Sequence, residues 1–366
     1  MRLALQLAAK GQGRVEPNPM VGCVLVQDGI CIGQGYHHAF GGPHAEVDAL
    51  KSCADAADAT AYVTLEPCCH QGKTPPCSLA LIDAHVRRVV VAMRDPHAKV
   101  NGDGIGQLRD AGIDVTLGVL KHDAEELNAP YLKRLRTGLP WVIAKWAMTA
   151  DGRTATVTGQ SQWISGAESR KHVHRLRSRV DAIVVAMGTV ISDDPMLNAR
   201  LPAGGPGSDH PARLAKRIVL CRKRIPPIDS KLIRTADAIP TWIFASPLVE
   251  TSELRSLEEA GAIIFRLDTD DAQQMVLQTL QQLGGIEMTN VMIEGGPKLL
   301  GSFLDSSSGR CLIDECHVYV GAKVFGGQSA SGPIAGDGVG PIELAPTLSL
   351  HRVDRFDDDV RLIYRR

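Results

Sequence analysis

Short, largely apolar runs recur through the second half of the chain, and they limit its fold more than any other feature. Runs of this length, without polar alternation, are typical of strands buried on both faces of a parallel sheet. They cover residues 181–187, 217–221, 241–245, 262–267 and 291–293, with a helical pattern at 272–283 and an earlier strand-like stretch at 141–148. The alternation predicts an α/β domain with helices covering a mainly parallel sheet.

The first half alternates in a similar way but begins with a hairpin signal. Apolar runs at residues 21–26 and 30–35 are separated by Gln27-Asp28-Gly29, and Asp-Gly between two such runs favours a tight turn. The other expected elements are helices over residues 2–9, from about 45, and over 78–85, and strands over 61–67 and 88–93. Strand–helix–strand order again indicates a mainly parallel sheet.

A length of 366 residues suits two domains better than one. The segment NAPYLKRLRTGLP is polar and basic, and it ends in Gly138-Leu139-Pro140 just before the strand-like stretch at 141–148. Such a segment is a sensible domain junction. We therefore expect one domain over residues 1–138 and a second over residues 139–366.

The composition is that of a soluble globular protein, with 44% apolar residues, 22% charged residues and a formal net charge of -1. This balance gives no reason to expect nucleic acid or a membrane surface as a partner. No apolar run is long enough to span a bilayer. The first residues, MRLALQLAAKGQG, lack the length and cleavage pattern of a signal peptide, so we expect a cytoplasmic location.

Cysteine and histidine gather in the first half, in PHAE at residues 43–46 and TLEPCCHQGKTPPC at residues 64–77. The chain has nine cysteines, so they cannot all pair with one another in disulfides. In a reducing compartment, close cysteines with a nearby histidine are more often metal ligands or catalytic groups. A disulfide therefore remains only a minor alternative.

These residues favour a catalytic zinc site. His44, Cys68 and Cys77 supply three ligands, and three protein ligands leave tetrahedral zinc a fourth position for water. His44 and Cys77 each stand at the expected start of a helix, where the positive end of the helix dipole favours a thiolate. Glu46, two residues after His44, is suited to move a proton on and off the water. A structural zinc site, in which Cys69 or His70 completes or replaces these ligands, is the alternative.

The same residues resemble the zinc nucleoside deaminase superfamily, in which the glutamate is a general acid/base and not a ligand. The departure is the spacing, because eight residues, CHQGKTPP, separate Cys68 from Cys77 where two are usual. With PNPMVG at residues 17–22, this insert resembles the pyrimidine deaminase half of the bifunctional riboflavin-biosynthesis deaminase–reductase family. The resemblance implies a cytidine-deaminase-like fold, a bound Zn²⁺ and a pyrimidine contact from Asn18.

In the second half, a glycine pair follows the last of the apolar runs, in VMIEGGPKLLGSF at residues 291–303. A glycine pair between strand and helix permits close approach of a ligand, but it equally suits a plain tight turn. The passage lacks the Gly-x-Gly-x-x-Gly dinucleotide fingerprint. Two arginines, Arg177 and Arg200, are candidates to grip a phosphate ester. Arg222, in the basic stretch 222–224, is a candidate for the 2′-phosphate of NADP.

In order along the chain, AKWAMTADGRT, SQWIS, MGTVISDDPMLNAR and IEGGPKLLGSF resemble the pyrimidine reductase half of the same family. That resemblance implies a dihydrofolate-reductase-like fold and NADPH as cofactor. The implied contacts with NADPH come from Ala147, Trp163, Thr189, Asp193, Gly296, Pro297, Lys298, Leu299, Leu300, Gly301 and Ser302. The implied contacts with the phosphorylated substrate come from Ser161, Arg177, Leu197, Arg200 and Glu294.

The resemblance thus implies a two-domain enzyme that deaminates a ribosylaminopyrimidine phosphate and then reduces its ribosyl group to ribityl. Lys145 is a candidate polar helper in the second step, and the family suggests a homodimer or a higher homo-oligomer. One rival hypothesis is a nucleic-acid deaminase with an accessory domain, although aromatic residues are only 4% of the chain. Others are a non-catalytic zinc-stabilised scaffold, and a chain in which one half has lost its activity.

Overall fold

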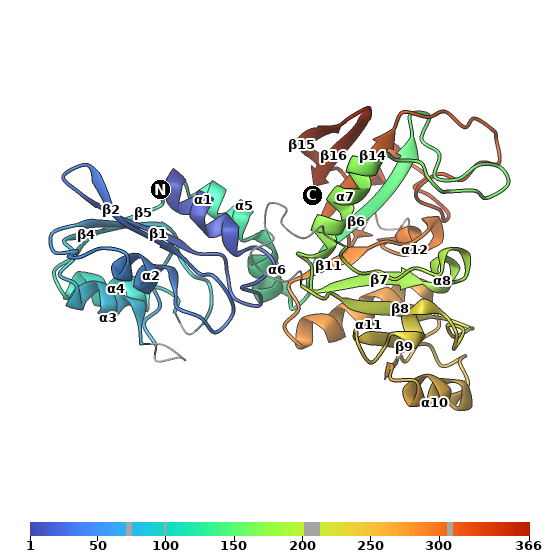
Figure 1. The fold of residues 1–366 in the computed structure, drawn as a ribbon, viewed down its shortest axis with the longest axis horizontal. Coiled ribbons are helices and arrows are strands. Elements are labelled where there is room, and N and C mark those ends of the chain that lie inside the picture. The colour runs from blue at the N-terminus through green and yellow to red at the C-terminus, as the bar shows by residue number, and fades with distance from the viewer. Residues whose placement is uncertain (71–74, 99, 201–212, 306–309) are drawn as a thin grey trace. The chain divides into compact units, whose positions relative to one another are not determined.

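The computed structural model describes residues 1–70, 75–98, 100–200, 213–305 and 310–366. The chain forms two compact units, Met1–Gly138 and Leu139–Arg366, each with its own β-sheet (Figure 1). In the described part of the chain, no helix combines the length and apolar character needed to cross a membrane.

The first unit is built on a five-stranded sheet with strand order β2-β1-β3-β4-β5. β1 pairs antiparallel with β2 and β3, whereas β3, β4 and β5 are parallel. The strands are β1 Gly22–Gln27, β2 Ile30–Tyr36, β3 Thr60–Leu65, β4 Arg88–Met93 and β5 Asp114–Leu117. The helices are α1 Arg2–Ala8, the short 3₁₀ helix η1 Ala9–Gly11, α2 Ala45–Lys51, α3 Cys77–Asp83, α4 Asp103–Asp110, α5 Lys121–Leu127 and α6 Ala129–Thr137.

The hairpin expected from Asp28-Gly29 is confirmed, since both residues have positive φ, 50° and 80°, between antiparallel β1 and β2. Glycine also brings α2 close to β2, because a Cβ on Gly35 would lie 2.3 Å from the backbone nitrogen of Ala49. One expected boundary is wrong. β3 ends at Leu65, and Cys68 lies in the loop after the strand.

The second unit is built on a nine-stranded sheet with strand order β10-β9-β8-β7-β11-β6-β14-β16-β15. The seven strands from β10 to β14 are parallel, and β16 and β15 continue the sheet antiparallel. The sheet strands are β6 Trp141–Thr149, β7 Ala182–Ala186, β8 Lys216–Cys221, β9 Thr241–Ala245, β10 Ile263–Arg266, β11 Asn290–Ile293, β14 Glu315–Gly321, β15 Ser349–Phe356 and β16 Asp359–Arg365. A separate two-stranded sheet joins β12 Leu304–Asp305 and β13 Arg310–Cys311.

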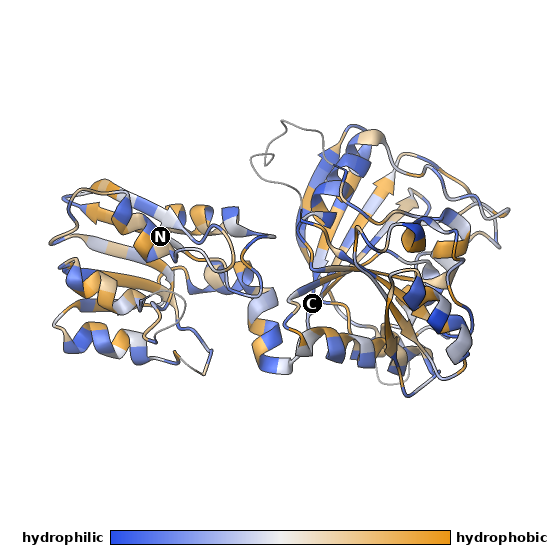
Figure 2. Cartoon of the chain, turned by 60° about the horizontal axis from the view of Figure 1, so that its bottom comes forward, coloured by the Kyte–Doolittle hydropathy of each residue, from blue (hydrophilic) through white to orange (hydrophobic). Residues whose placement is uncertain are grey.

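Helices cover both faces of this sheet, whose strands are largely hydrophobic in Figure 2. One apolar cluster joins Val184 and Phe244 to residues of α11 and α12, and another joins Ile183 and Ile243 to residues of α7, α9 and α10. Successive residues of one strand therefore pack into clusters on opposite faces of the sheet, because side chains alternate between the two faces of a strand. The helices are α7 Ala167–Arg177, α8 Met187–Asp193, α9 Lys231–Arg234, α10 Thr251–Glu259, α11 Ala272–Gly285, α12 Pro297–Gly301 and the 3₁₀ helix η2 Ile342–Leu344.

Candidate functional sites

Three segments bring the candidate zinc ligands together in the first unit. His44 immediately precedes α2, Cys77 is the first residue of α3, and Cys68 lies in the loop after β3. The loop is fixed to the start of α3, because Cys68 Sγ accepts a hydrogen bond from the Cys77 backbone N–H at 3.3 Å. Both helix starts therefore face one point, as the sequence predicts.

A second set of contacts, made by Glu66 and helix α4, fixes the loop that carries Cys68. Glu66 is buried, and its carboxylate accepts backbone hydrogen bonds from Asp95, Gly102 and Ile105 at 3.2–3.3 Å. Helix α4 packs directly on the loop, since a Cβ on Gly104 would lie 1.9 Å from the carbonyl oxygen of Pro67. The residue before Cys68 therefore has very little freedom.

The donor atoms of the cluster have the spacing that a single metal ion requires. His44 Nδ1 lies 3.2 Å from Cys77 Sγ and 3.5 Å from Cys68 Sγ, and all three ligand atoms lie within 4.8 Å of one another. One imidazole nitrogen and two sulfurs form a donor set that zinc favours. Among the described residues, neither Cys69 nor His70 belongs to this cluster.

The protein groups alone already favour a thiolate at this point. Hydrogen bonds from Cys77 and His44 lower the pKa of Cys68 to about 4, against the effect of burial. The neighbouring Cys68 thiolate and burial raise the pKa of Cys77. Burial, followed by the charge of Cys68, raises the pKa of Glu46 to about 7. Glu46 is only 3% exposed and lies in the first turn of α2, beside the ligands.

Asn18 is held beside this cluster by a histidine that sequence analysis did not assign to the site. The Asn18 side-chain nitrogen lies 3.3 Å from His37 Nε2, and His37 Nδ1 lies 2.9 Å from the carbonyl oxygen of Pro43. The rings of His37 and His44 lie edge to face, with centroids 5.5 Å apart. His37 therefore links Asn18 to the residues that precede α2, and no local motif marks this role.

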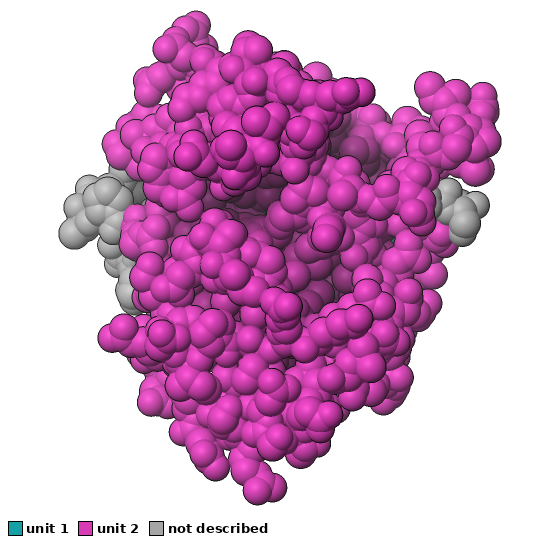
Figure 3. All heavy atoms as spheres, turned by 90° about the vertical axis from the view of Figure 1, so that its right-hand side faces the viewer, with its two compact units in different colours: residues 1–138 teal, residues 139–366 magenta. Residues whose placement is uncertain are grey.

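In the second unit, several of the candidate ligand residues follow the carboxyl ends of neighbouring parallel strands. The parallel strands β7, β8 and β11 end at the same edge of the sheet, followed by Met187, Arg222 and Glu294 respectively. Ligands of open α/β sheets bind at the carboxyl ends of the strands. A Cβ built on Gly188 or Gly296 would meet no atom within 4 Å, so the backbone after β7 and after β11 borders open space. Figure 3 looks onto the side of the unit that carries α8, and the surface there is hollowed.

Arg177 and Glu294 form a bidentate ion pair at this edge. The Arg177 Nε and one terminal nitrogen each lie 2.7 Å from a Glu294 carboxylate oxygen, and both side chains are largely buried. Arg177 also donates to the carbonyl oxygen of Asn198 at 3.3 Å, and Arg200 donates to the Asn198 side chain at 2.9 Å. The two arginines predicted to grip a phosphate thus share one neighbour.

Lys145, on β6, lies close to this pair. Burial lowers the pKa of Lys145, and the charge of Glu294 partly opposes that effect. Among the described residues, its ammonium makes no hydrogen bond or ion pair, and its contact is with the face of Tyr319. Because Glu294 is already paired with Arg177, Lys145 offers an unused cation at the edge of the site.

The other residues predicted to bind NADPH or substrate include some that are exposed and some that are buried. Trp163 is 59% exposed, with the Arg170 guanidinium 4.6 Å from its ring centroid, and Arg222 is exposed and paired with Asp270 at 3.3 Å. Leu197, Leu299 and Leu300 are buried in the core, so they offer very little surface to a ligand. Ser161 precedes α7, Ala147 lies on β6, Thr189 and Asp193 lie in α8, and Pro297, Lys298, Gly301 and Ser302 lie in or beside α12.

Two family models match the chain, one in each unit. Residues 1–93 match the cytidine and deoxycytidylate deaminase zinc-binding region, and residues 140–362 match the RibD C-terminal domain. Together the matches cover most of the chain in the order that the sequence motifs predict.

Full-length relatives give the same result. The riboflavin biosynthesis protein RibD of Actinobacillus pleuropneumoniae is 37% identical over 365 residues, covering 100% of this chain and 94% of that protein. The solved structure of Acinetobacter baumannii RibD, form 1, is 36% identical with a TM-score of 0.85, covering 100% of this chain and 97% of that one. A Thermotoga maritima diaminohydroxyphosphoribosylaminopyrimidine deaminase/5-amino-6-(5-phosphoribosylamino)uracil reductase is 31% identical with a TM-score of 0.82, at the same coverages.

These matches confirm the predicted fold class, a cytidine-deaminase-like unit followed by a dihydrofolate-reductase-like unit. The chain belongs to the RibD family of riboflavin-biosynthesis proteins.

Proposed function

We propose that this chain catalyses two successive reactions of riboflavin synthesis on one small phosphorylated pyrimidine. The first unit removes the 2-amino group of 2,5-diamino-6-ribosylamino-4(3H)-pyrimidinone 5′-phosphate as ammonia. The second unit then uses NADPH to reduce the ribosyl group to ribityl. The observation that carries the proposal is the cluster of His44, Cys68 and Cys77 beside a buried Glu46, in a chain of this family.

In the first reaction, His44, Cys68 and Cys77 hold the zinc ion and Glu46 moves the protons. Zinc held by one histidine and two cysteines supplies a Lewis acid that makes water a nucleophile near neutral pH. Glu46, which is not one of the three ligands, takes a proton from the attacking water and passes it to the ring nitrogen. Glu46 then moves the remaining hydroxyl proton of the adduct to the amino group, the carbon–nitrogen bond breaks as the carbonyl forms, and ammonia leaves. Asn18, fixed by His37, holds the pyrimidine.

In the second reaction, the protein mainly positions the two reactants. NADPH supplies a hydride to C1′ of the ribosyl group. The bond between C1′ and the ring oxygen breaks, and that oxygen takes a proton from the Lys145 ammonium, which makes no hydrogen bond or ion pair within the described part of the chain. Arg177, Arg200 and Glu294, with Ser161 and Leu197, bind the phosphorylated substrate.

The NADPH contacts follow the open edge of the sheet. Two of these contacts, Thr189 and Asp193, lie in the helix that follows β7 and contains Gly188. The others lie in the segment 296–302 after β11, which begins at Gly296. Both glycines border open space. Ala147 and Trp163 complete this set. Arg222, exposed after β8, receives the 2′-phosphate of the cofactor in exchange for its contact with Asp270.

The rival hypotheses make different predictions about the same site. A zinc-stabilised scaffold has no use for Glu46. This carboxylate is only 3% exposed and is not a ligand, so its burial lowers the stability of the fold. A role in catalysis explains why it is nevertheless present. A nucleic-acid deaminase needs a basic or aromatic groove, and the chain has a net charge of -1. A chain with one inactive half would lack the donor set of one unit.

We further propose that the enzyme acts in the cytoplasm as a homodimer or a larger homo-oligomer, without nucleic acid. β15 lies at the edge of the nine-stranded sheet and exposes Leu350 and Val353, a surface that a second copy of the chain would cover. Light scattering after size-exclusion chromatography tests this part, and a mass of one chain at micromolar concentration would contradict it.

The function is tested by mass spectrometry of the pyrimidine phosphate after incubation with the purified, zinc-loaded protein. Without NADPH, we expect ammonia release and the corresponding exchange of an amino group for oxygen. With NADPH, we expect a further gain of two hydrogens. Deamination without reduction would contradict the reductase activity proposed for the second unit. An unchanged substrate in both reactions would refute the whole proposal.

A further inference from the structure

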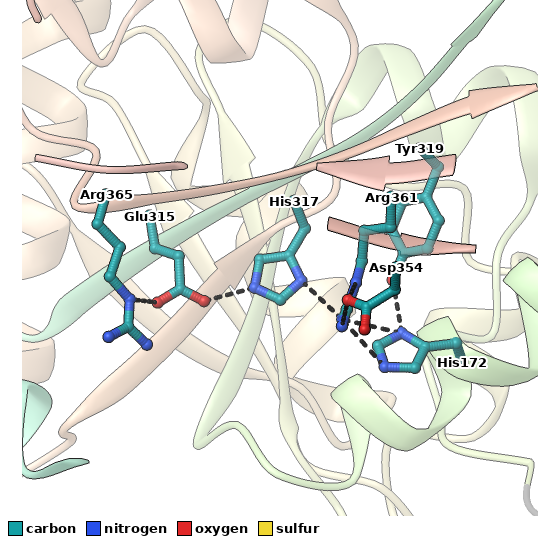
Figure 4. A network of polar contacts seen from close by, with 7 residues as sticks. All are labelled: His172, Glu315, His317, Tyr319, Asp354, Arg361 and Arg365. Carbon is teal, nitrogen blue, oxygen red and sulfur yellow. Dashed lines mark hydrogen bonds and ion pairs between the residues drawn. The ribbon is translucent and has the colours of Figure 1, made fainter. Parts of the chain in front are cut away.

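A network of buried and half-buried polar side chains joins α7 to the C-terminal strands (Figure 4). Tyr319 on β14 lies under the Lys145 ammonium, whose nitrogen is 6.0 Å from the ring centroid. The Tyr319 hydroxyl lies 2.7 Å from Nδ1 of His172 on α7. Arg361 on β16 reaches His172, with 3.0 Å between its terminal nitrogen and Nε2. Asp354 on β15 in turn binds Arg361 at 2.5 Å.

The strand register explains why these residues meet. On β14, Glu315, His317 and Tyr319 alternate along one face, and His317 stands directly opposite Lys145 of β6. Lys145 and Tyr319 therefore project from neighbouring strands on the same face of the sheet. α7 covers this face, and it carries both His172 and Arg177.

The direction of the contact between Arg361 and His172 follows from the guanidinium. A guanidinium only donates, so the nearer histidine nitrogen, Nε2 of His172, accepts from it. Nδ1 shares a hydrogen bond of 2.7 Å with the Tyr319 hydroxyl, and the same Arg361 nitrogen lies 3.3 Å from Nδ1. This assignment requires a neutral His172, and burial together with the charge of Arg361 lowers its pKa to about 3. The Tyr319 ring is thus fixed through its hydroxyl group.

A second group of contacts, around Glu315, joins strands β14 and β16. His317 lies 2.5 Å from Glu315, and Arg365 of β16 binds the other carboxylate oxygen of Glu315 at 2.8 Å. Burial opposes the charged form of Glu315, but His317 and Arg365 lower its pKa to about 2. β14 and β16 are therefore tied together by side chains two and four positions before Tyr319.

We propose that Tyr319 is a positioning residue for Lys145: its ring face holds the ammonium at the edge of the reduction site, and His172 and Arg361 hold the ring. Tyr319 is 0% exposed, so it acts through Lys145 and does not touch the substrate. The negative face of an aromatic ring attracts a cation without consuming its hydrogens, so all three N–H groups of Lys145 stay available for the substrate. The inference rests on the reductase activity proposed above.

The experiment compares Tyr319→Leu, Tyr319→Phe and Tyr364→Leu in the full chain. Tyr364 makes a matched control, because it lies on neighbouring β16 but packs on the opposite face of the sheet. Reductase kcat and KM are measured with the deaminated substrate. Deamination by the same protein reports the amount of correctly folded first unit. The reactivity of Lys145 is measured separately, by acetic anhydride labelling and peptide mass spectrometry.

For Tyr319→Leu, we expect reductase kcat to fall about tenfold, with both KM values within about twofold of the wild type. Lys145 should react with the anhydride at least about threefold faster, because the ammonium loses the aromatic face that it contacts. Tyr319→Phe keeps the ring and should retain kcat within about threefold. Tyr364→Leu should leave both the labelling of Lys145 and kcat near the wild-type values.

The inference and the proposed function fail in different ways. Unchanged labelling of Lys145 in Tyr319→Leu, or equal losses of kcat in Tyr319→Leu and Tyr364→Leu, would overturn the positioning role while reduction by the wild type still stands. Full reductase activity in Lys145→Met would also overturn it, because there would be no catalytic group to position. Absence of NADPH-dependent reduction in the wild type would instead refute the proposed function.

Discussion

Arg177 and Glu294 stand 117 positions apart in the sequence, yet their charged groups meet through two parallel contacts of 2.7 Å. The guanidinium lies on α7 and the carboxylate directly follows β11, so the pair ties a covering helix to the central strand of the sheet. The same pair borders the proposed substrate site. Stability and binding therefore depend on the same two side chains, and variants of them must be measured for both.

Glu294→Ala is expected to destabilise the second unit by about 3–5 kcal/mol, because it leaves a largely buried Arg177 without its partner. Replacement of both residues, as in Arg177→Met with Glu294→Met, should cost less, since no unpaired charge remains. Urea unfolding followed by tryptophan fluorescence measures the difference. A single variant as stable as the double variant would contradict the prediction.

Acid should unfold the second unit through the same pair. Burial alone would raise the pKa of Glu294, but Arg177 lowers it to about 2. A carboxylate with a lowered pKa stabilises the fold fully above its ordinary pKa of about 4.5, and this contribution is lost as the pH falls towards 2. The unfolding free energy should therefore decrease from about pH 4.5 to pH 2. In Glu294→Gln, denaturant titrations across that range should show a shallower decrease.

Glu46→Gln should keep zinc and lose deamination. The amide cannot take up the proton that the carboxylate carries, so the rate of ammonia release should fall by about a hundredfold or more. Zinc content is measured by elemental mass spectrometry, and NADPH oxidation with the deaminated substrate serves as the control for the second unit. Normal ammonia release from this variant would favour a purely structural metal.

Gly104→Ala should weaken zinc binding although residue 104 is not a ligand. The new methyl group would lie 1.9 Å from the carbonyl oxygen of Pro67 and would displace the loop that carries Cys68. Gly106→Ala is the matched control in the same helix, because a Cβ there meets no atom within 4 Å. We expect competition with a chelator to release zinc from the first variant at lower chelator concentration, and from the second as in the wild type.

Arg222→Ala should change the choice of cofactor. If Arg222 leaves Asp270 to bind the 2′-phosphate, its removal should raise KM for NADPH by about tenfold and leave KM for NADH unchanged. Steady-state kinetics with both cofactors measure the ratio. An equal change in both KM values would remove Arg222 from the 2′-phosphate site.

The zinc cluster was predictable because its information is local. His44 and Cys77 stand at helix starts that proline and the apolar pattern mark, so the sequence places both ligands at defined points of the fold. The apolar runs likewise predict the parallel strands, since burial on both faces leaves a continuous signal. The end of β3 was missed by two residues: the strand ends at Leu65, although the Glu66 backbone N–H still donates to the Met93 carbonyl oxygen at 3.0 Å.

The other interactions depend on pairs that no local pattern records. Tyr319 and His172 are 147 positions apart, and Arg361 and His172 are 189 apart. β15 has no apolar run because most of its residues are exposed. Arg217 is also instructive: a charged residue at the start of an apolar run is 0% exposed and binds the carbonyl oxygens of Leu232, Thr235 and Ile239. Composition alone would place such a side chain at the surface.

The strand order of the two sheets has a consequence for synthesis on the ribosome. The first sheet is assembled from residues 22–117, so its last strand is made before residue 120 has been added. In the second sheet, β11 lies between β6 and β7, and β6 also pairs with β14. β6 therefore has no partner strand until residues 290–293 have left the exit tunnel, which at about 5–20 residues per second takes at least several seconds. The nascent chain thus carries a folded deaminase unit ahead of a long unfinished segment, and the apolar strands of that segment are the part that needs protection by chaperones.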